Sequence, residues 1–348
     1  QYKLNKFLKY NKKNGDFTLD PALRFGGKRN INQRFSDKFI KIFGEPLFNK
    51  KKITKNNKNL AFNVQWRLEE IVKLLVKDLI KITKISNLCL AGGVHMNCKL
   101  NGVLADLPEI KNIYVQPASS DNGVALGAAM LSAKNDKGKF SKMEHCYYGN
   151  GFTNNEIKNY LKESKIKFKK VKNIEKQIAI KLSKGKIIGW FQGRSEVGAR
   201  ALGNRSILAN PLLKNMKKKL NDEVKHRENW RPFCPSINDY RYKDYFGNVP
   251  ESDFMILAFK MRKKYRKFLP SAVHVDGTSR PQIVKQKTNK KFYKLIKEFE
   301  KITGHAILIN TSFNIQGEPI VNKPSEAIRC FSGTGIDYLA IGDFLITK

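Results

Sequence analysis

Between residues 88 and 134 the sequence twice runs from a short apolar strand through a polar loop into a helix. The first strand, around Cys89, leads to the glycine pair Gly92-Gly93, and the second, at 113–116, leads to the polar loop 117–123. A helix of small residues, VALGAAMLSA, follows the second loop. This repeated order is typical of an α/β fold, in which ligands bind beyond the ends of the strands.

The rest of the chain continues this alternation. An amphipathic helix is predicted at 63–82, whereas the first sixty residues, with turn signals at Asn14-Gly15-Asp16 and Gly26-Gly27, are expected to be irregular. The length of 348 residues and a linker at 135–138 predict two domains, 1–140 and 141–348. In the second domain we expect helices at 154–163 and 174–183, and strands at 186–192, 306–309 and 338–341.

The formal net charge of +37 would suit a nucleic-acid-binding protein. However, the lysines are spread along the chain beside Asn and Ile, as an AT-rich coding sequence would produce. No basic stripe with interleaved aromatic residues occurs. We therefore expect a solvated lysine surface, and a dedicated nucleic-acid site is disfavoured.

The cysteines and the apolar runs predict a cytoplasmic chain without a membrane segment. The five cysteines form no C-x-x-C pair, which favours reduced thiols over a zinc site. No run of 18 uncharged apolar residues occurs, and the first residues lack the apolar core of a signal peptide. Because the chain starts at Gln1 and enters at once into KLNKFLKYNKKNGDF, we expect an amino-terminal truncation.

The two loops of the first half contain one set of candidate ligand-binding residues. Gly92 and Gly93, with Asn97 nearby, would let backbone amides approach a phosphate, although a tight strand-to-helix turn explains a glycine pair equally well. Asp121 precedes a helix, so it is either an N-cap or one carboxylate ligand of a divalent metal. A single Asp cannot make a metal site, and the other ligands would have to come from elsewhere.

The densest polar segment is QGRSEVGARALGNRS, which directly follows a predicted apolar strand. It contains Arg194, Arg200 and Arg205 among glycines spaced every five residues. Because each glycine would weaken a helix by about 1 kcal/mol, we do not expect a solvated helix face here. Guanidinium groups at this density match the oxygens of phosphates or carboxylates.

Three further segments add polar residues: VKHRENWRP with Lys225, TSRPQ with Arg280, and NTSFN with Asn310 and Ser312. Amides and hydroxyls after the apolar strand AILI can hydrogen-bond a nucleotide or an acyl group, although an Asx or ST turn is an equal alternative. No Ser-His-Asp or Cys-His arrangement and no G-x-x-x-x-G-K-[ST] loop occurs, which disfavours a covalent hydrolase and a P-loop kinase.

Taken in order, these segments resemble the carbamoyltransferase family of nodulation and antibiotic-tailoring enzymes, from about residue 60 to the end. The resemblance lies in LAGGVHMNCKLNG, VQPASSDNGVALGAAM, GRSEVGARALGNRSILANP, VKHRENWRPFCPS, TSRPQIV and NTSFNIQGEPIVNKPSEAI. It implies an α/β protein in which residues 1–140 are the rear half of an actin-like ATPase (ASKHA) domain, similar to the universal tRNA threonylcarbamoylation protein. Residues 141–348 would form a YrdC-like twisted-sheet domain, resembling threonylcarbamoyl-adenylate synthase.

The resemblance also implies an ATP-dependent O-carbamoyltransferase. Carbamoyl phosphate and ATP would give carbamoyl-adenylate, whose carbamoyl group then passes to a hydroxyl of a small molecule. Arg200, Lys225 and Arg280 would stabilise developing charge, with Asn310 and Ser312 orienting the carbamoyl and phosphate groups. The residues implied for nucleotide binding are Gly92, Gly93, Asn97, Arg194 and Arg205.

The family pattern further implies a divalent metal, Fe or Mg/Mn, bound by Asp121 and two histidines expected upstream of this sequence, so an incomplete site is predicted here. The acceptor and the assembly, a homodimer among the options, are left open. One rival is a tRNA threonylcarbamoylation enzyme, and the other is a non-catalytic basic nucleic-acid-binding protein. GRSEVGARALGNRS together with NTSFN favours the carbamoyltransferase.

Overall fold

The computed structural model describes residues 4–11, 13–20, 35–47, 53–135, 138 and 143–348. The chain divides into two compact units, which are described separately. The first consists of Gln1–Leu88 and Asp106–Asn112, and the second of Cys89–Ala105 and Ile113–Lys348.

The first unit is built on one long helix, α2 (Lys55–Thr83), which begins earlier than the predicted residue 63. The hydroxyl of Thr54 and the side chain of Asn57 cap its start reciprocally, as in a capping box. Ile71 and Val76 are the only described residues of α2 that are buried. The predicted helix is thus confirmed, although Val64 and Leu79 of its apolar face are exposed.

The amino-terminal residues of the first unit are partly regular. Strands β1 (Leu8–Asn11) and β2 (Asp16–Leu19) form an antiparallel hairpin, preceded by η1 (Leu4–Lys6) and followed by α1 (Asp37–Phe43). Arg67 of α2 donates two hydrogen bonds to the carbonyl of Leu8, at 3.1 and 2.6 Å. The expectation of an irregular segment is therefore wrong for α1 and for the hairpin, whose turn lies at the predicted Asn14-Gly15. The turn signal at residues 26–27 falls outside the described residues.

The two strand–loop–helix segments found in the sequence fall mostly in the second unit, which starts within β3. The first comprises β3 (Asn87–Leu90), η3 (Gly93–Met96) and α3 (Cys98–Ala105), and the second β4 (Asn112–Val115), η4 (Asp121–Gly123) and α4 (Val124–Asn135). Strands β3 and β4 pair with each other. Their order matches the prediction.

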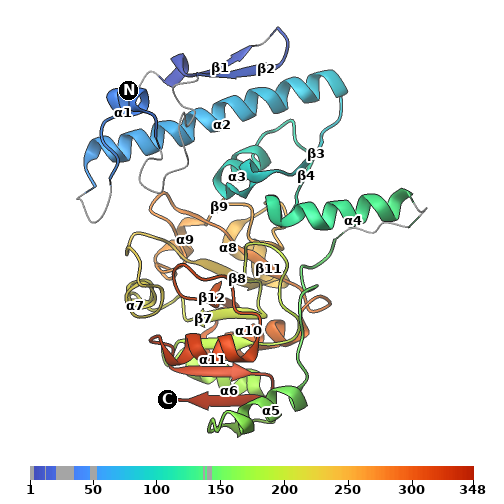
Figure 1. Ribbon diagram of the computed structural model, residues 1–348, viewed down its shortest axis with the longest axis vertical. Helices are drawn as coiled ribbons and strands as arrows, with labels where there is room; N and C mark the ends of the chain where they lie inside the picture. The colour runs from blue at the N-terminus through green and yellow to red at the C-terminus, as the bar shows by residue number, and fades with distance from the viewer. Residues whose placement is uncertain (1–3, 12, 21–34, 48–52, 136–137, 139–142) are drawn as a thin grey trace. The chain divides into compact units, whose positions relative to one another are not determined.

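The main body of the second unit is an eight-stranded mixed sheet (Figure 1). Its strand order is β11 (Gln282–Val284), β8 (Cys234–Asn238), β12 (Ile307–Ser312), β7 (Arg205–Ala209), β6 (Ile188–Phe191), β13 (Tyr338–Ile341), β14 (Phe344–Thr347) and β5 (Lys169–Lys170). The pairs β11–β8 and β13–β6 are parallel, and the other neighbouring pairs are antiparallel. The predicted strands at 186–192, 306–309 and 338–341 all lie in this sheet.

Helices cover both faces of the sheet, so residues of its central strands are buried whichever face they point to. Side chains of α6 (Ile174–Ser183) and α10 (Lys290–Thr303) pack with Trp190 and Leu208 on one face. Side chains of α5 (Asn154–Glu163), α7 (Met216–Leu220) and α11 (Pro324–Ser332) pack with Phe191 and Ile207 on the other. Adjacent strand residues thus serve opposite cores, and the mixed α/β class is confirmed. The remaining elements are η5 (Asn221–Lys225), α8 (Asp239–Phe246), β9 (Phe259–Lys260), α9 (Lys263–Arg266) and β10 (Thr278–Ser279).

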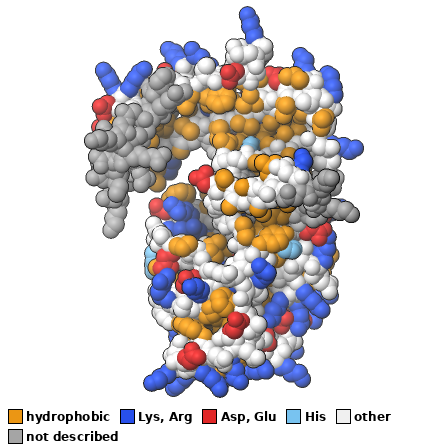
Figure 2. Space-filling view, turned by 45° about the vertical axis from the view of Figure 1, so that its right-hand side comes forward, with side chains coloured by type: hydrophobic (Ala, Val, Ile, Leu, Met, Phe, Trp, Pro, Cys, Tyr) orange, Lys and Arg blue, Asp and Glu red, His pale blue; other side chains and the backbone are white. Residues whose placement is uncertain are grey.

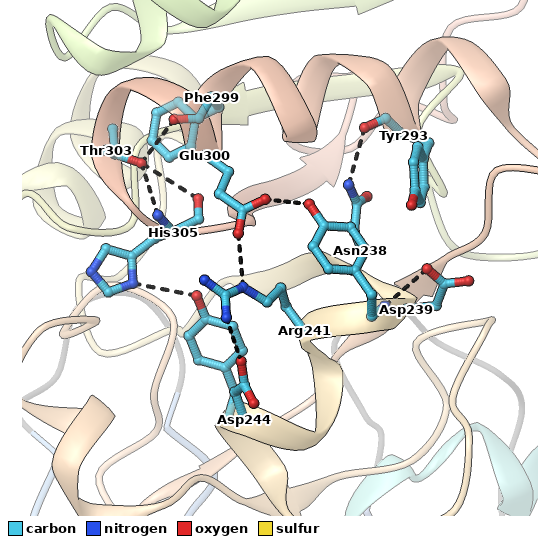
Figure 3. A network of polar contacts seen from close by, with 11 residues as sticks. Asn238, Asp239, Arg241, Asp244, Tyr293, Phe299, Glu300, Thr303 and His305 are labelled. Carbon is cyan, nitrogen blue, oxygen red and sulfur yellow. Dashed lines mark hydrogen bonds and ion pairs between the residues drawn. The ribbon is translucent and has the colours of Figure 1, made fainter.

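A polar network fixes α8, which follows β8, to the end of α10 (Figure 3). Arg241 forms ion pairs with Glu300 at 2.7 Å and Asp244 at 3.0 Å. The hydroxyl of Tyr245 lies 3.3 Å from Nδ1 of His305. These contacts hold one end of β8, and the other end of that strand leads into the candidate site.

The surface agrees with a dispersed positive charge. Figure 2 shows Lys and Arg side chains spread around the visible face instead of forming one continuous stripe. In the part of the chain that the structure describes, no helix combines the length and the hydrophobicity needed to cross a bilayer. All five cysteines are free.

Candidate functional site

The centre of the site is the guanidinium group of Arg280, which follows β10. Its Nε and Nη2 atoms donate to the sulfur of Cys234, the first residue of β8, at 3.0 and 2.9 Å. Sulfur is a weak acceptor. Among the described residues, Arg280 forms no ion pair with Asp or Glu, so its charge lacks an acidic partner.

Two further arginines lie close enough to Arg280 for its charge to lower their pKa values. Burial and the charge of Arg280 lower the pKa of Arg200 to about 10, and the Nε of Arg200 is buried without a hydrogen-bond partner. The pKa of Arg227 is lowered by burial, by Arg231 and, more weakly, by Arg280. We call Arg200, Arg227 and Arg280 the guanidinium cluster. Like charges held together in a partly buried place favour the binding of an anion.

Asn310 of β12 is next to this cluster through the sheet register, because it stands opposite Cys234. Its Nδ2 donates to Oγ of Ser236 at 3.0 Å and to Oε1 of Gln282 at 3.1 Å. Its Oδ1 is buried and has no partner. A ligand with an N–H or O–H group would satisfy that oxygen.

Lys225 lies at the end of the π-helix η5 and is buried. Its Nζ donates to the carbonyl and hydroxyl oxygens of Ser312 at 2.5 and 3.3 Å, and to the carbonyl and amide oxygens of Asn314 at 2.9 and 2.8 Å. No carboxylate is among these four acceptors. Burial lowers the pKa of Lys225 to about 7. The ammonium group is therefore placed at the end of β12 without an opposite charge.

The side chains of the other two predicted arginines donate hydrogen bonds to backbone carbonyls. Arg194 donates to the carbonyls of Gly149 and Tyr148, at 2.9 and 2.8 Å. Arg205 is fully buried over the ring of Phe191, and its donors reach four backbone carbonyls. These contacts favour a structural role for both side chains.

Glu196 organises the loop that holds Arg200. Its Oε1 accepts the backbone N–H groups of Leu202, Asn204 and Arg205, at 2.7, 2.8 and 3.2 Å. The three glycines of this segment have positive φ angles, 48° at residue 193, 107° at residue 198 and 105° at residue 203. The prediction that this segment is not a helix face is confirmed, because left-handed φ values would interrupt a helix.

A cavity of about 550 Å³ lies between this loop and the end of β12. Its size falls in the range of small-molecule sites. Ser312 and Asn314, the acceptors of Lys225, form part of its wall together with Glu196. The remaining wall is made by Asn122, Gly149, Asn150, Ser195, Gly198, Ala199, Glu318, Pro319, Ile320, Val321 and Asn322. Glu196 stands among the arginines of this segment, but spacing in the sequence does not show which carboxylate lines a cavity.

Comparison with known proteins supplies the family. Residues 4–130 match the carbamoyltransferase N-terminus and residues 179–348 match the carbamoyltransferase C-terminus. The chain belongs to the carbamoyltransferase family.

Its relatives are longer proteins. An uncharacterized protein of Synechocystis sp. is 35% identical over 97% of this chain and 60% of its own length. The nodulation protein NolNO of Sinorhizobium fredii is 38% identical over 85% of the chain and 45% of its own length. The 3'-hydroxymethylcephem-O-carbamoyltransferase of Amycolatopsis lactamdurans is 31% identical over 74% and 48%. The chain spans about half to three fifths of these relatives.

The similarity of this chain to solved structures is weak. A full-length HypF in a phosphate- and nucleotide-bound form covers 49% of the chain with a TM-score of 0.38 and 20% identity. A likeness at this level does not establish a common fold.

The glycine loop of this carbamoyltransferase chain lies in the same unit as the guanidinium cluster. Gly92 has a φ of 90°, and a Cβ atom at Gly92 or Gly93 would meet open space. Oδ1 of Asn97 accepts from the N–H of Leu100 at 3.1 Å, as an N-cap would. Both glycines are exposed, and Asn97 stabilises the start of α3.

Helix α3 packs directly beside residues 256–258, which lead into β9. The N–H of Ala258 donates to the carbonyl of Cys98 at 3.1 Å, and a Cβ added at Gly102 would stand 2.0 Å from the carbonyl oxygen of Ala258. The sulfur of Cys98, like that of Cys234, raises the pKa of Arg280 against the lowering effect of burial. The glycine loop and the cluster are thus joined by close packing.

Asp121 is exposed and stands at the start of η4. Among the described residues no group of three or more His, Cys, Asp or Glu side chains is arranged to hold a metal ion. The described residues alone therefore do not fit a metal centre, and no step of the chemistry below depends on one.

Proposed function

We propose that this chain contains the carbamoyl-adenylate-forming part of an ATP-dependent O-carbamoyltransferase. Residues 141–348 would be the YrdC-like domain that makes the intermediate, and residues 1–140 part of the actin-like domain that uses it. Family membership supports this proposal. The observation that favours it most is the guanidinium cluster, which lies beside Cys234 with no acidic partner for Arg200 or Arg280 among the described residues.

The proposed chemistry joins two anionic substrates. Water cleaves carbamoyl phosphate to carbamate and inorganic phosphate. A carbamate oxygen then attacks the α-phosphorus of ATP, the bond from that phosphorus to the bridging oxygen breaks, and pyrophosphate leaves. Finally a hydroxyl of the acceptor attacks the carbamoyl carbon, its proton is lost, and AMP departs.

The proposed roles follow from the charges. Arg200 and Arg280 would bind phosphoryl oxygens, since guanidinium forks match them and since neither arginine is paired with Asp or Glu among the described residues. The buried Lys225 would add a third positive charge where the triphosphate meets β12. Stabilisation of developing negative charge by fixed cations is a large contribution to phosphoryl transfer.

Asn310 and Ser312 would orient the carbamoyl group. The unpaired Oδ1 of Asn310 can accept an N–H of the carbamoyl amide, which no cation could do. Ser312 offers a hydroxyl on the wall that separates Lys225 from the cavity. Gly92 and Gly93 would receive the adenylate phosphate on backbone amides.

Carbamoyl-phosphate-dependent exchange of pyrophosphate into ATP tests the adenylation step on this chain. The exchange should be lost in Arg280→Ala and retained in Arg241→Ala, whose arginine pairs with Glu300 and Asp244 instead. Equal exchange in Arg280→Ala and in the unaltered chain would contradict the proposal. Exchange that requires threonine and bicarbonate instead of carbamoyl phosphate would favour the threonylcarbamoylation enzyme.

The transfer step concerns a small hydroxylated acceptor, as the name of the cephem O-carbamoyltransferase relative suggests. We expect the acceptor-dependent release of AMP to follow adenylation. Modification of tRNA instead of a small molecule would contradict this part of the proposal while leaving the adenylation step intact.

A further inference from the structure

Between β9 and β10 the chain makes an excursion, residues 261–277, which is closed at its base by hydrogen bonds. Strand β9 runs antiparallel to β10, and the N–H of Met261 donates to the carbonyl of Gly277 at 3.0 Å. The Nε of Arg266 donates to the carbonyl of Met261 at 2.7 Å. These contacts fix the excursion to the second unit. Four cations and two apolar residues of the excursion are exposed, namely Arg262, Lys263, Lys264, Lys267, Phe268 and Val275.

The excursion has an excess of positive charge that the neighbouring side chains do not neutralise. From residue 254 to residue 276 the sequence has six Lys and Arg residues and one acidic residue, Asp276. None of these six cations forms an ion pair within the described part of the chain. The carboxylate of Asp276 accepts from the N–H and the hydroxyl of Thr278, at 2.9 and 2.6 Å. The excess of positive charge is therefore available to attract an anionic partner.

Two exposed apolar side chains accompany these charges. Phe268 is 60% exposed, just beyond α9. Val275 is fully exposed in a turn in which the N–H of Gly277 donates to the carbonyl of His274 at 2.9 Å. Single exposed apolar residues are common on protein surfaces. Here, however, two of them share one short excursion with a concentrated positive charge.

The lysine-rich segment 162–170 differs in this respect. Its lysines are exposed as well, but Ile166 and Phe168 between them pack against the hydrophobic core of the second unit. That arrangement is a solvated basic surface over a buried apolar layer. In the excursion the cations and the apolar side chains are exposed together, which is the composition of a surface that binds the boundary of a lipid bilayer.

The apolar residues favour lipid over nucleic acid as the partner. Proteins that bind single strands stack the bases on several aromatic rings. Of the Tyr and Phe residues in the excursion, Tyr265 packs its ring on Tyr245, with the ring centroids 4.6 Å apart, and only Phe268 is exposed. Val275 has no ring on which a base could stack, whereas an aliphatic side chain can enter the apolar part of a bilayer.

We infer that the excursion 261–277 is a docking surface for an anionic lipid bilayer. Its lysines and arginines attract the phosphate groups of the lipids, and each contributes about fivefold to the affinity. Phe268 and Val275 enter the boundary between the headgroups and the acyl chains. None of these side chains belongs to the candidate site, so this binding does not depend on the proposed reaction.

Flotation of the full 348-residue chain with lipid vesicles tests the charge of the excursion. One set of vesicles is phosphatidylcholine alone, and the other contains about one third phosphatidylglycerol, which is anionic. The unaltered chain should bind the anionic vesicles at least about 100-fold more tightly. The combined substitution Lys263→Gln, Lys264→Gln and Lys267→Gln should weaken that binding about 100-fold, at about fivefold for each lysine.

A matched control removes the same charge from the segment 162–170. The combined substitution Lys162→Gln, Lys167→Gln and Lys169→Gln should keep binding to anionic vesicles within about threefold of the unaltered chain, because no exposed apolar side chain holds that surface at the bilayer. A third variant, Phe268→Ser with Val275→Ser, leaves the net charge unchanged. It should bind anionic vesicles about tenfold more weakly, through loss of apolar burial.

All substituted side chains are exposed, so Tm should be unchanged in the three variants. Equal losses of vesicle binding in the two lysine variants would overturn the inference, because net charge alone would then explain the attraction. Full vesicle binding by the Phe268→Ser, Val275→Ser variant would overturn it too. So would an unaltered chain that does not bind anionic vesicles but binds single-stranded RNA through the lysines of the excursion. Loss of pyrophosphate exchange in the unaltered chain would contradict the proposed function alone.

Discussion

Arg280 directs two N–H donors at the single sulfur atom of Cys234, at 3.0 and 2.9 Å. A fork of this kind ordinarily meets the two oxygens of a carboxylate or a phosphate. Because a thiol satisfies it poorly, the arrangement leaves most of the hydrogen-bonding strength of Arg280 for a ligand.

Inorganic pyrophosphate should therefore bind to the guanidinium cluster. We expect Arg280→Met to weaken its affinity about 100-fold, because a charge-assisted hydrogen-bonded pair is lost. Titration calorimetry measures the effect. Arg241→Met is the comparison, since its arginine is paired with Glu300 and Asp244, and affinity in that variant should stay within about twofold. A similar drop in both variants would point to general electrostatic attraction.

Replacement of Arg200 should stabilise the unliganded chain. Its Nε is buried without a partner, and burial together with the charge of Arg280 lowers its pKa to about 10. Arg200→Met removes this repulsion, and we expect the free energy of unfolding to rise by about 1 kcal/mol, with Tm higher by about 2–4 °C. Scanning calorimetry with and without pyrophosphate should show a more stable chain that pyrophosphate no longer stabilises. A lower Tm would show that Arg200 contributes to packing instead.

Stability should depend on pH through Lys225. Burial lowers its pKa to about 7 in the folded chain, from an ordinary value near 10.4 in the unfolded chain. Between those values the unfolded chain binds more protons, so stability rises with pH, by at most about 1.4 kcal/mol per pH unit. Urea unfolding at pH 7 to 10 checks the slope against Lys225→Met, which should lack this contribution. Lys218→Met, on the exposed side of α7, should keep it.

Pyrophosphate binding should show the opposite trend with pH. The ammonium form of Lys225 attracts the anion, and its fraction falls as the pH rises above about 7. Affinity should fall by up to about tenfold per pH unit from pH 7 to 9 in the unaltered chain. The Lys225→Met chain should bind weakly throughout and lack that slope. Parallel curves for the two chains would exclude Lys225 as the titrating group.

A substitution at Gly203 tests whether the arginine-containing loop depends on a glycine at that position. Its φ of 105° strains any other residue, and a Cβ there would stand 2.2 Å from the ring of Phe292. We expect Gly203→Ala to lower the free energy of unfolding by about 3 kcal/mol, through strain and overpacking. Chemical denaturation measures it. Gly304 has a φ of 77° and open space for a Cβ. Gly304→Ala therefore introduces the backbone strain without the clash, and it should lower the free energy of unfolding by less.

Much of the fold was predictable because it depends on local patterns. The strands that became β6, β12 and β13 are apolar runs bounded by polar residues, and burial on both faces requires such runs. Helix α6 was predicted with its observed bounds. The β1–β2 hairpin was missed since its strands alternate weakly, and only the Asn14-Gly15 turn marked it.

The residue types of the candidate site were predictable, but the hydrogen-bond partners of its side chains were not. Clustered arginines among glycines indicated an anion site, yet Arg205 and Arg200 look alike in the sequence. The structure directs the Nη atoms of Arg205 at backbone carbonyls, whereas it places Arg200 near the charge of Arg280; the Nε of each arginine is buried without a partner. That difference arises from the antiparallel pairing of β6 and β7, a tertiary feature that spacing cannot supply.

The contact of Gly102 with Ala258 has a consequence for reading genetic variation in this chain. Any side chain at position 102 would collide with a carbonyl oxygen and push α3 away from the segment that leads to β9. In a saturation screen for activity, position 102 should tolerate no substitution, although it touches no proposed substrate. An intolerant glycine of this kind would be mistaken for a catalytic position unless thermal stability were scored alongside turnover.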